Sequence, residues 1–165
     1  PPRSTLFPYT TLFRSTLIEL VVTVAIVGIL AATAMPLVEL GAQRAREAEL
    51  RSALRQIRGA IDAYKAAADE GRIARPEGSS GYPPKLEVLA GGVRDARDPD
   101  GSMIYFLRRL PRDSFHSEGG LPAEASWGKR SYASSPDDPR EGDDVFDVYS
   151  MAGGTGLDGV PYREW

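Results

Sequence analysis

The sequence predicts an α+β fold in which one long N-terminal helix, from about residue 16 to about residue 70, packs on a small antiparallel β-sheet. Three observations support this prediction: an uncharged apolar run at residues 20–38, a helical repeat of apolar residues at 50–68, and short strand-like segments after Gly71. The chain has 165 residues, which is enough for one domain with a long element attached.

The apolar run predicts a transmembrane helix. Residues 20–38 carry no charge over 19 positions and are bounded by Glu19 and Glu39, so a helix of this length spans roughly the hydrocarbon thickness of a bilayer. The alternatives are a buried helix of a soluble core and a cleaved secretory signal. The run is apolar on every face and the helical pattern continues beyond it, and both features favour a spanning helix. We expect Gly28 and Pro36 to kink or loosen this helix, because proline has no N–H to donate to the preceding turn.

The second half of the predicted helix is amphipathic. Apolar residues recur at spacings of three and four, and charged residues occupy the opposite face, so the apolar stripe should pack on the rest of the chain. A coiled-coil seam is the alternative, although the stripe lasts less than three heptads. Gly71 is the expected end of the helix. The stripe consists of Leu50, Leu54, Ile57, Ile61, Tyr64 and Ala68, with Ala53, Ala60 and Ala67 beside it.

Turn-forming residues dominate the chain after Gly71, most clearly at 76–84. A short helical turn is predicted at 85–89, ended by Gly91 and Gly92. Three segments rich in aromatic or β-branched residues are predicted strands, and they lie at 103–107, 131–133 and 145–150.

The composition excludes several classes of function. A formal net charge of −3 offers no basic field for nucleic acid, so we expect no nucleic-acid partner. The chain has no cysteine and one histidine, His116, which excludes thiolate zinc sites and leaves little for a histidine-based triad. The acidic residues between 137 and 147 are expected to form a solvated loop, with a second cation site as the alternative. No spacing identifies a paired-carboxylate or serine-hydrolase site, so we expect that the protein is not an enzyme.

Glu19 is the last charged residue before the apolar run. An ionised carboxylate at the hydrocarbon edge is costly unless it sits at the interface or meets a cation. Glu19 is therefore either a marker of the membrane boundary or a group that is used in a later state.

The segment Thr16–Leu20, followed by an apolar run with a proline near its end, resembles the N-terminus of type IV pilins and type II secretion pseudopilins. In that family a glycine precedes the peptidase cut, an N-methylated phenylalanine begins the mature chain, and a glutamate follows four residues later. Glu19 takes the place of that glutamate and Ser15 the place of the phenylalanine, whereas Arg14 stands where glycine is expected. The resemblance implies an assembly role for Glu19, and it marks Ser15 as the position of processing and methylation without the native residue.

Residues 1–15 look foreign to a leader of this family. Ser4–Phe7 recurs loosely as Thr11–Phe13, and the string resembles translated sequencing adapter. We expect it to be non-native or the remnant of a leader, with a short natural extension as the alternative, and it takes no part in the predicted fold.

The region after Gly71 contains six notable segments: Gly81–Pro84, Leu86–Leu89, Tyr105–Asp113, Trp127–Gly128, Arg130–Tyr132 and Asp147–Ser150. In their order and spacing these segments resemble the major, G-type pseudopilin of type II secretion. The C-terminal loop of that family is rich in glycine, contains aspartate and commonly binds calcium, which takes about 6–8 oxygen ligands. Residues 150–159 take its place here, with Asp158 inside the loop and Asp147 before it, so the resemblance implies these two carboxylates as candidate calcium ligands.

The resemblance implies a structural pseudopilin subunit of a type II secretion system. Such a subunit crosses the bacterial inner membrane once, exposes its C-terminal domain to the periplasm, and assembles with copies of itself into a helical pseudopilus. Its implied partners are prepilin peptidase, minor pseudopilins and the inner-membrane assembly platform. The alternatives are a membrane-anchored periplasmic binding module and a subunit of a true type IV pilus. The expected parts of the chain are residues 1–15, the transmembrane half 16–38, the amphipathic half 39–70, and the periplasmic region 71–165, which packs on 42–70.

Overall fold

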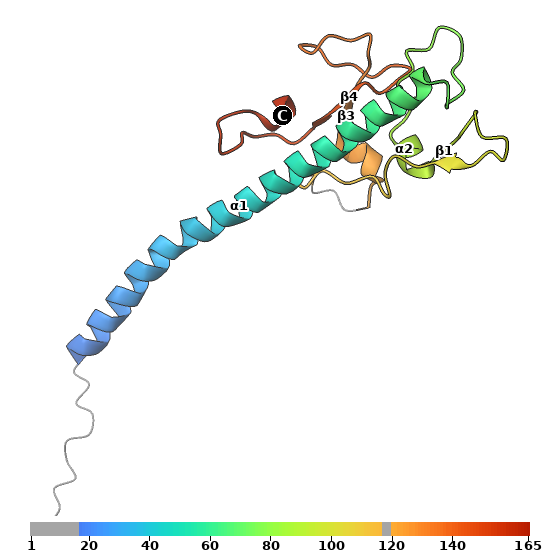
Figure 1. The fold of residues 1–165 in the computed structure, drawn as a ribbon. Helices are drawn as coiled ribbons and strands as arrows, with labels where there is room; N and C mark the ends of the chain where they lie inside the picture. Colours follow the sequence, from blue (N-terminus) through green and yellow to red (C-terminus); the bar gives the residue numbers. More distant parts are fainter. Residues whose placement is uncertain (1–16, 117–119) are drawn as a thin grey trace, which may run out of the picture. The chain divides into compact units, whose positions relative to one another are not determined.

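The longest element is helix α1, Leu17–Asp69, in a computed structural model that describes residues 17–116 and 120–165 (Figure 1). Its 53 residues confirm the predicted long helix; Thr16, where the helix was expected to begin, lies outside the described residues. The chain divides into two units, Pro1–Ala42 and Gln43–Trp165, and α1 contributes residues to both.

Gly71 ends α1, as predicted. Its φ is +72°, a left-handed conformation that costs glycine little because it has no Cβ. The Gly71 N–H donates to the Ala68 carbonyl at 3.0 Å, and the Arg72 N–H donates to the Ala67 carbonyl at 2.9 Å. These two bonds form a Schellman motif, which satisfies carbonyl groups that the helix end would leave without partners.

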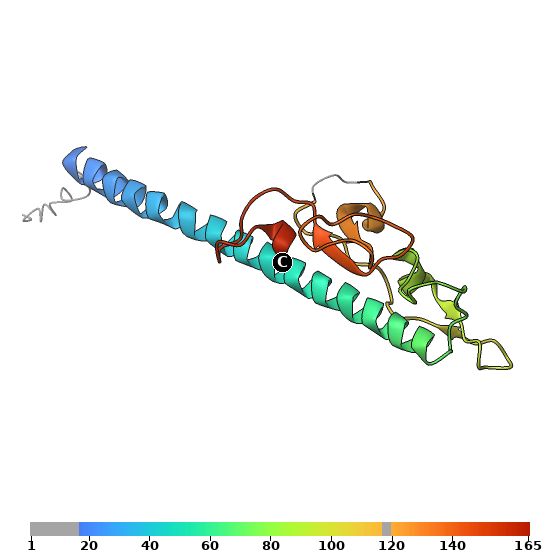
Figure 2. The same ribbon diagram turned by 90° about the horizontal axis from the view of Figure 1, so that it is seen from above.

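The apolar stripe of α1 forms one wall of the core of the Gln43–Trp165 unit. All nine predicted stripe residues are buried, and Leu50 and Ile57 are 0% exposed. Figure 2 shows most of the loops and strands of this unit along one side of the C-terminal part of α1. The core residues that the rest of the unit supplies are Ile73, Leu86, Leu89, Trp127, Val145, Val148 and Tyr162.

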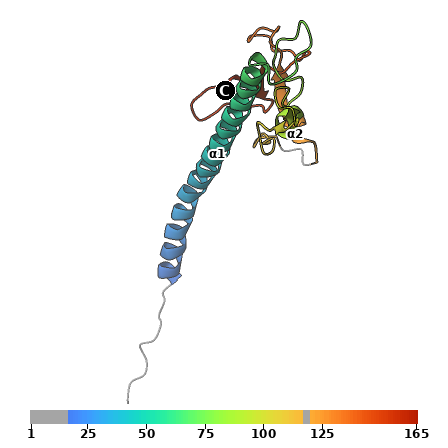
Figure 3. The same ribbon diagram turned by 45° about the vertical axis from the view of Figure 1, so that its right-hand side comes forward.

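The strands form two small antiparallel sheets rather than the single sheet that we expected. Figures 1 and 3 show α2 on one side of the C-terminal part of α1 and the C-terminal segment on the other. The elements after α1 are α2 (Glu87–Gly91), β1 (Val93–Arg94) paired with β2 (Met103–Ile104), and β3 (Trp127–Arg130) paired with β4 (Asp147–Ser150), with 3₁₀ turns at Ala123–Ser126 and Tyr162–Glu164.

The strand predicted at 103–107 is wrong beyond Ile104. The N–H groups of Phe106 and Leu107 both donate to the carbonyl of Leu89, at 3.0 and 2.9 Å. The chain therefore leaves the sheet after Ile104 and hydrogen-bonds to Leu89, in the middle of α2. The predicted helical turn at 85–89 is shifted and runs from Glu87 to Gly91.

The strand predicted at 131–133 is also wrong, because Ser131 begins a turn. The Ser134 N–H donates to the Ser131 carbonyl at 3.1 Å, and the ladder partner of β4 is the preceding segment Trp127–Arg130. The strand predicted at 145–150 is confirmed for Asp147–Ser150, and the N–H of Val145 donates instead to the Pro83 carbonyl at 2.8 Å.

Strand β4 follows the alternation of a half-buried strand. Val148 and Ser150 are 0% exposed, whereas Asp147 and Tyr149 are only partly buried. The register places Gly128 of β3 opposite Tyr149, and a Cβ at residue 128 would lie 2.3 Å from the Tyr149 ring. Glycine is thus required there to let the tyrosine ring lie across the strand.

Asp144 joins two loops of the Gln43–Trp165 unit. Its carboxylate accepts hydrogen bonds from the Ser80 hydroxyl, from the Ser131 hydroxyl at 2.9 Å and from the Tyr132 N–H at 2.9 Å. Burial alone would raise the pKa of this carboxyl, but the three hydrogen bonds together outweigh it and lower the pKa below its ordinary value. The ionised form of Asp144 is therefore the form that the fold stabilises.

We predict that Ile57→Asp unfolds the Gln43–Trp165 unit, because it buries an unpaired carboxylate at a site with no exposed surface. The expected cost is about 4 kcal/mol or more. The matched control is Ala63→Asp, since Ala63 is exposed on the same helix. Urea unfolding followed by far-UV circular dichroism measures both variants, and a cooperative transition for Ile57→Asp close to that of the control would contradict the packing.

We predict a loss of stability at acid pH that depends partly on Asp144. A carboxyl whose pKa is lower in the folded state stabilises the fold above its unfolded pKa, and this contribution is lost as the pH falls through the folded pKa. Asp144→Asn should therefore weaken the pH dependence of the unfolding free energy between neutral and acid pH. Asp143→Asn is the control, because Asp143 is exposed and its carboxylate forms no hydrogen bond or ion pair with another described residue. Identical acid profiles for Asp144→Asn and the parent would refute this assignment.

Candidate functional site

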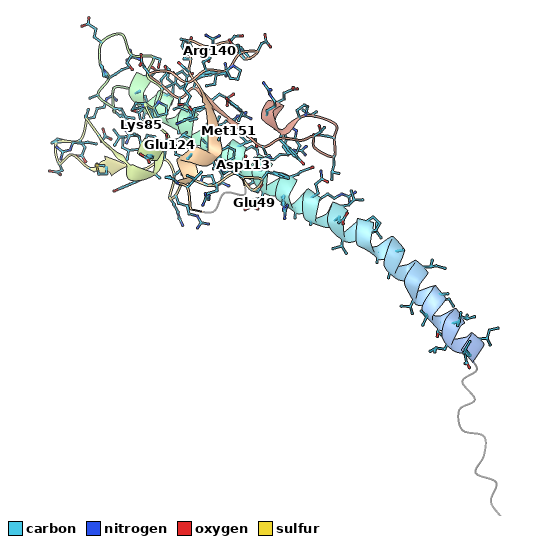
Figure 4. All side chains as sticks on the ribbon, turned by 180° about the vertical axis from the view of Figure 1, so that it is seen from behind. Glu49, Lys85, Asp113, Glu124, Arg140 and Met151 are labelled. Atoms are coloured by element: carbon cyan, nitrogen blue, oxygen red, sulfur yellow. The ribbon has the colours of Figure 1, made fainter. Side chains whose placement is uncertain are left out.

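The N-terminal part of α1 presents an apolar surface on all sides. An 18-residue window of this segment has a mean hydropathy of 2.4, and none of it is buried within the chain. Figure 4 shows the side chains drawn for residues 17–42 projecting around the helix, with no other described element of that unit around them. The helix is long and apolar enough to cross a membrane. Its surface includes Leu17 at 80% exposure and Val38 at 72%.

Glu19 lies in the first turn of α1 and is exposed. A carboxylate at this position interacts favourably with the positive end of the helix dipole. Within the described parts of the chain, the Glu19 carboxylate forms no hydrogen bond or ion pair. Ser15, the predicted processing position, lies outside the described residues.

Gly28 and Pro36 both lie inside the continuous helix α1. A Cβ at Gly28 would meet no atom within 4 Å in the single chain. Pro36 has no N–H, so the carbonyl one turn earlier lacks its usual helical partner. A kink at these residues stays a prediction.

The two candidate calcium ligands, Asp147 and Asp158, each face an arginine of α1. The Arg58 Nε lies 2.7 Å from one Asp147 oxygen, and the Arg51 Nη2 lies 2.5 Å from one Asp158 oxygen. Asp158 also accepts the Val160 N–H at 3.0 Å and so closes its own turn. Among residues 17–116 and 120–165, no three histidine, cysteine or acidic side chains form a group that could hold a metal ion.

Glu47 is a buried carboxylate that the sequence analysis missed. It is 6% exposed, and one of its oxygens accepts hydrogen bonds from the Gln43 side chain at 2.9 Å, the Leu157 N–H at 3.0 Å and the Tyr162 hydroxyl at 3.1 Å. Burial raises the pKa of Tyr162, and the Glu47 carboxylate raises it further, so the hydroxyl remains a donor at neutral pH. Glu47 stands three residues before the buried Leu50, so both residues lie on the same face of the helix. This spacing could have predicted that Glu47 is buried.

Asp113 is a second buried carboxylate without a predicted role. It is 2% exposed, lies within the folded unit (Figure 4), and accepts hydrogen bonds from the Ser150 hydroxyl at 2.5 Å and the Phe115 N–H at 2.8 Å. Its own N–H donates to the Ser126 hydroxyl at 3.2 Å. Asp113 therefore ties the segment before β3 to the end of β4.

A cavity near the C-terminal end of α1 has a volume of about 800 Å³. The aromatic residues Tyr64, Tyr82 and Tyr132 line it, and the rings of Tyr82 and Tyr132 stack with centroids 5.6 Å apart. His116 is not among its lining residues.

No family model, no curated protein and no solved structure matches this chain.

We predict that Glu47→Ala destabilises the folded unit by about 1–3 kcal/mol, because the Leu157 N–H and the Tyr162 hydroxyl lose their acceptor. Glu49→Ala is the control, since Glu49 is exposed on the same turn of α1 (Figure 4). Urea unfolding, followed by the fluorescence of Trp127 and Trp165, measures both. Equal urea midpoints for the two variants would show that the Glu47 hydrogen bonds do not stabilise the folded unit.

Proposed function

We propose that the chain is a structural subunit of a filament, a pseudopilin of a type II secretion system. The observation that carries this proposal is one continuous helix with two kinds of apolar surface. In the N-terminal part, the apolar side chains that follow Glu19 are exposed on all sides of the helix. In the C-terminal part, the apolar stripe from Leu50 to Ala68 is buried in the Gln43–Trp165 unit. A subunit that leaves the bilayer for a helical bundle requires both surfaces.

The first part of the mechanism concerns burial. In the membrane, lipid covers the exposed apolar residues between Leu17 and Leu40. In a filament, the same residues of neighbouring copies would cover one another, so the apolar surface stays out of water in both states. The orientation with the Gln43–Trp165 unit in the periplasm, and the partners implied by the family, belong to this proposal through the resemblance of Thr16–Leu20.

The second part concerns Glu19. In a filament its carboxylate would pair with the free N-terminal amine of an adjacent processed subunit, which compensates a charge that is otherwise costly near hydrocarbon. Because the pair needs one carboxylate and one amine, it also fixes the axial position of one subunit against the next. The helix would bend or loosen at Gly28 and Pro36 as it leaves the bilayer.

We predict that Glu19→Leu inserts into the membrane as well as the parent but fails to enter filaments. The test replaces residues 1–15 by a leader that ends in Gly-Phe, and it expresses the chain in a bacterium with a type II secretion system. Membrane fractionation measures insertion, and cross-linking between copies measures assembly. The expected result is equal insertion and a loss of cross-linking.

Glu39→Leu is the matched control for this experiment, because Glu39 bounds the same apolar run at its other end. This variant should insert and cross-link like the parent. If Glu19→Leu also cross-links and forms filaments normally, the assembly role is wrong and a plain membrane anchor remains.

A membrane-anchored binding module is the second candidate function. The cavity lined by Tyr64, Tyr82 and Tyr132 favours it, since ligand sites are commonly concave and rich in aromatic residues. The two candidates differ in what Glu19 does: a binding module needs only an apolar anchor, whereas a filament subunit needs the carboxylate. Normal filaments from a variant with a filled cavity, Ala133→Phe, would favour the filament subunit.

A further inference from the structure

The guanidinium group of Arg58 lies in a cluster of oxygen atoms. Its Nε donates to a carboxylate oxygen of Asp147 at 2.7 Å, and its Nη2 donates to the carbonyl oxygens of Val148 at 3.0 Å and Trp165 at 2.7 Å. These oxygens belong to β4 and to the residue Trp165, which are far apart in sequence from α1. One positive group of the helix therefore holds two separate segments of the C-terminal region.

Carboxylate and carbonyl oxygens are also the ligands that calcium selects. In this chain, however, a cationic side chain already lies among them. The second Asp147 oxygen faces another cation, the Arg130 guanidinium of β3, with a nitrogen 3.4 Å away. Both oxygens of Asp147 thus have arginine partners.

Asp158, the other candidate calcium ligand, is held in a similar way. Its ion pair with Arg51 is supported by a cation–π contact, because the Arg51 guanidinium lies 4.0 Å from the centroid of the Trp165 ring. The same ring contacts the loop backbone closely: a Cβ at Gly156 would lie 2.3 Å from it. The loop therefore closes on Trp165 and Arg51, and both Asp158 oxygens already have partners, the Arg51 guanidinium and the Val160 N–H.

The residues present do not fit a calcium ion. An ion placed within about 2.5 Å of the Asp147 oxygens would lie beside the Arg58 charge, and the repulsion between the two cations would oppose binding. The described residues also provide no third acidic or histidine side chain to complete a ligand group.

We propose that the Arg58 guanidinium is a built-in cation, which takes the structural role that a bound calcium ion would have in the C-terminal region. The Gln43–Trp165 unit therefore keeps its fold without calcium. Arg51 and Arg130 complete this arrangement by pairing with the remaining carboxylate oxygens. The inference stands on these contacts and does not depend on the filament proposal.

The first arm of the test measures calcium dependence on the full chain in detergent micelles. The chain has two tryptophans, Trp127 and Trp165, and both lie in the Gln43–Trp165 unit, so thermal melts followed by fluorescence report on this unit. The expected result is the same Tm in millimolar calcium chloride and in excess EGTA. A Tm that rises with calcium, and a rise that Asp147→Asn abolishes, would overturn the proposal.

The second arm removes the built-in cation. Arg58→Met keeps an unbranched apolar stem and loses the guanidinium with its charge and donors, so the Tm should fall by several degrees or more. Arg55→Met is the matched control, because Arg55 is exposed on the same helix and its guanidinium forms no hydrogen bond or ion pair with another described residue. Its Tm should equal that of the parent.

Arg58→Lys keeps the test decisive if Arg58→Met does not fold. Lysine retains the charge at a single nitrogen and loses the planar group that reaches three oxygens, so its Tm should lie below that of the parent. A Tm for Arg58→Lys equal to the parent, or a Tm for Arg58→Met equal to that of Arg55→Met, would contradict the proposed role of Arg58.

Discussion

The burial of one stripe of α1 is the constraint on which the rest of the structure depends. Nine apolar residues between Leu50 and Ala68 lie on one face and are buried, and every core residue of the later segments packs into this cluster. The sheets have only two strands each, and a two-stranded sheet is marginally stable by itself in water. The helix face therefore supplies the surface without which neither sheet would persist.

Polar residues on the same helix decide where the C-terminal segment lies. Glu47, Arg51 and Arg58 follow one another at spacings of four and seven, so all three lie near one side of α1. Their partners are Leu157, Asp158 and Asp147, which lie in β4 and in the loop that follows it. Apolar packing is not directional, whereas these contacts have fixed geometry. The core thus holds the segment against α1, and the polar contacts fix its position along the helix.

Sequence periodicity predicted the parts of the fold that follow from local rules. The C-terminal limit of α1, its buried stripe and the glycine that ends it could be predicted, because helical spacing and left-handed glycine depend on neighbouring residues. The strands could be predicted less well from the sequence. Trp127–Arg130 contains a glycine, a lysine and an arginine, so its composition is poor for a strand, and only pairing with Asp147–Ser150 makes it one.

The candidate sites show the same division between local and long-range information. Glu19, Gly28 and Pro36 could be identified from the sequence because each is defined by its place in one apolar run. The partners of Asp147 and Asp158 on α1 could not, because Arg58 and Arg51 lie 89 and 107 positions earlier in the chain. A pattern of aspartates among glycines suggests a cation, and it cannot tell whether the positive charge is a metal ion or an arginine.

One helix in this chain meets two opposite requirements. Its N-terminal part is long and apolar enough to cross a membrane, and a spanning segment favours uncharged residues over the full circumference. Its C-terminal part must carry charge in water and still bury a stripe, which favours strict segregation of the two faces. The change occurs between Val38 and Glu47: before it no charge is present for 19 residues, and after it a buried carboxylate begins the polar contacts with the C-terminal segment. Glu19 stands apart from both arrangements, because it is charged and exposed and its carboxylate forms no hydrogen bond or ion pair within the described residues. In the filament that we propose, the amine of a neighbouring copy would pair with this carboxylate and offset the free energy that an ionised group costs at a membrane edge.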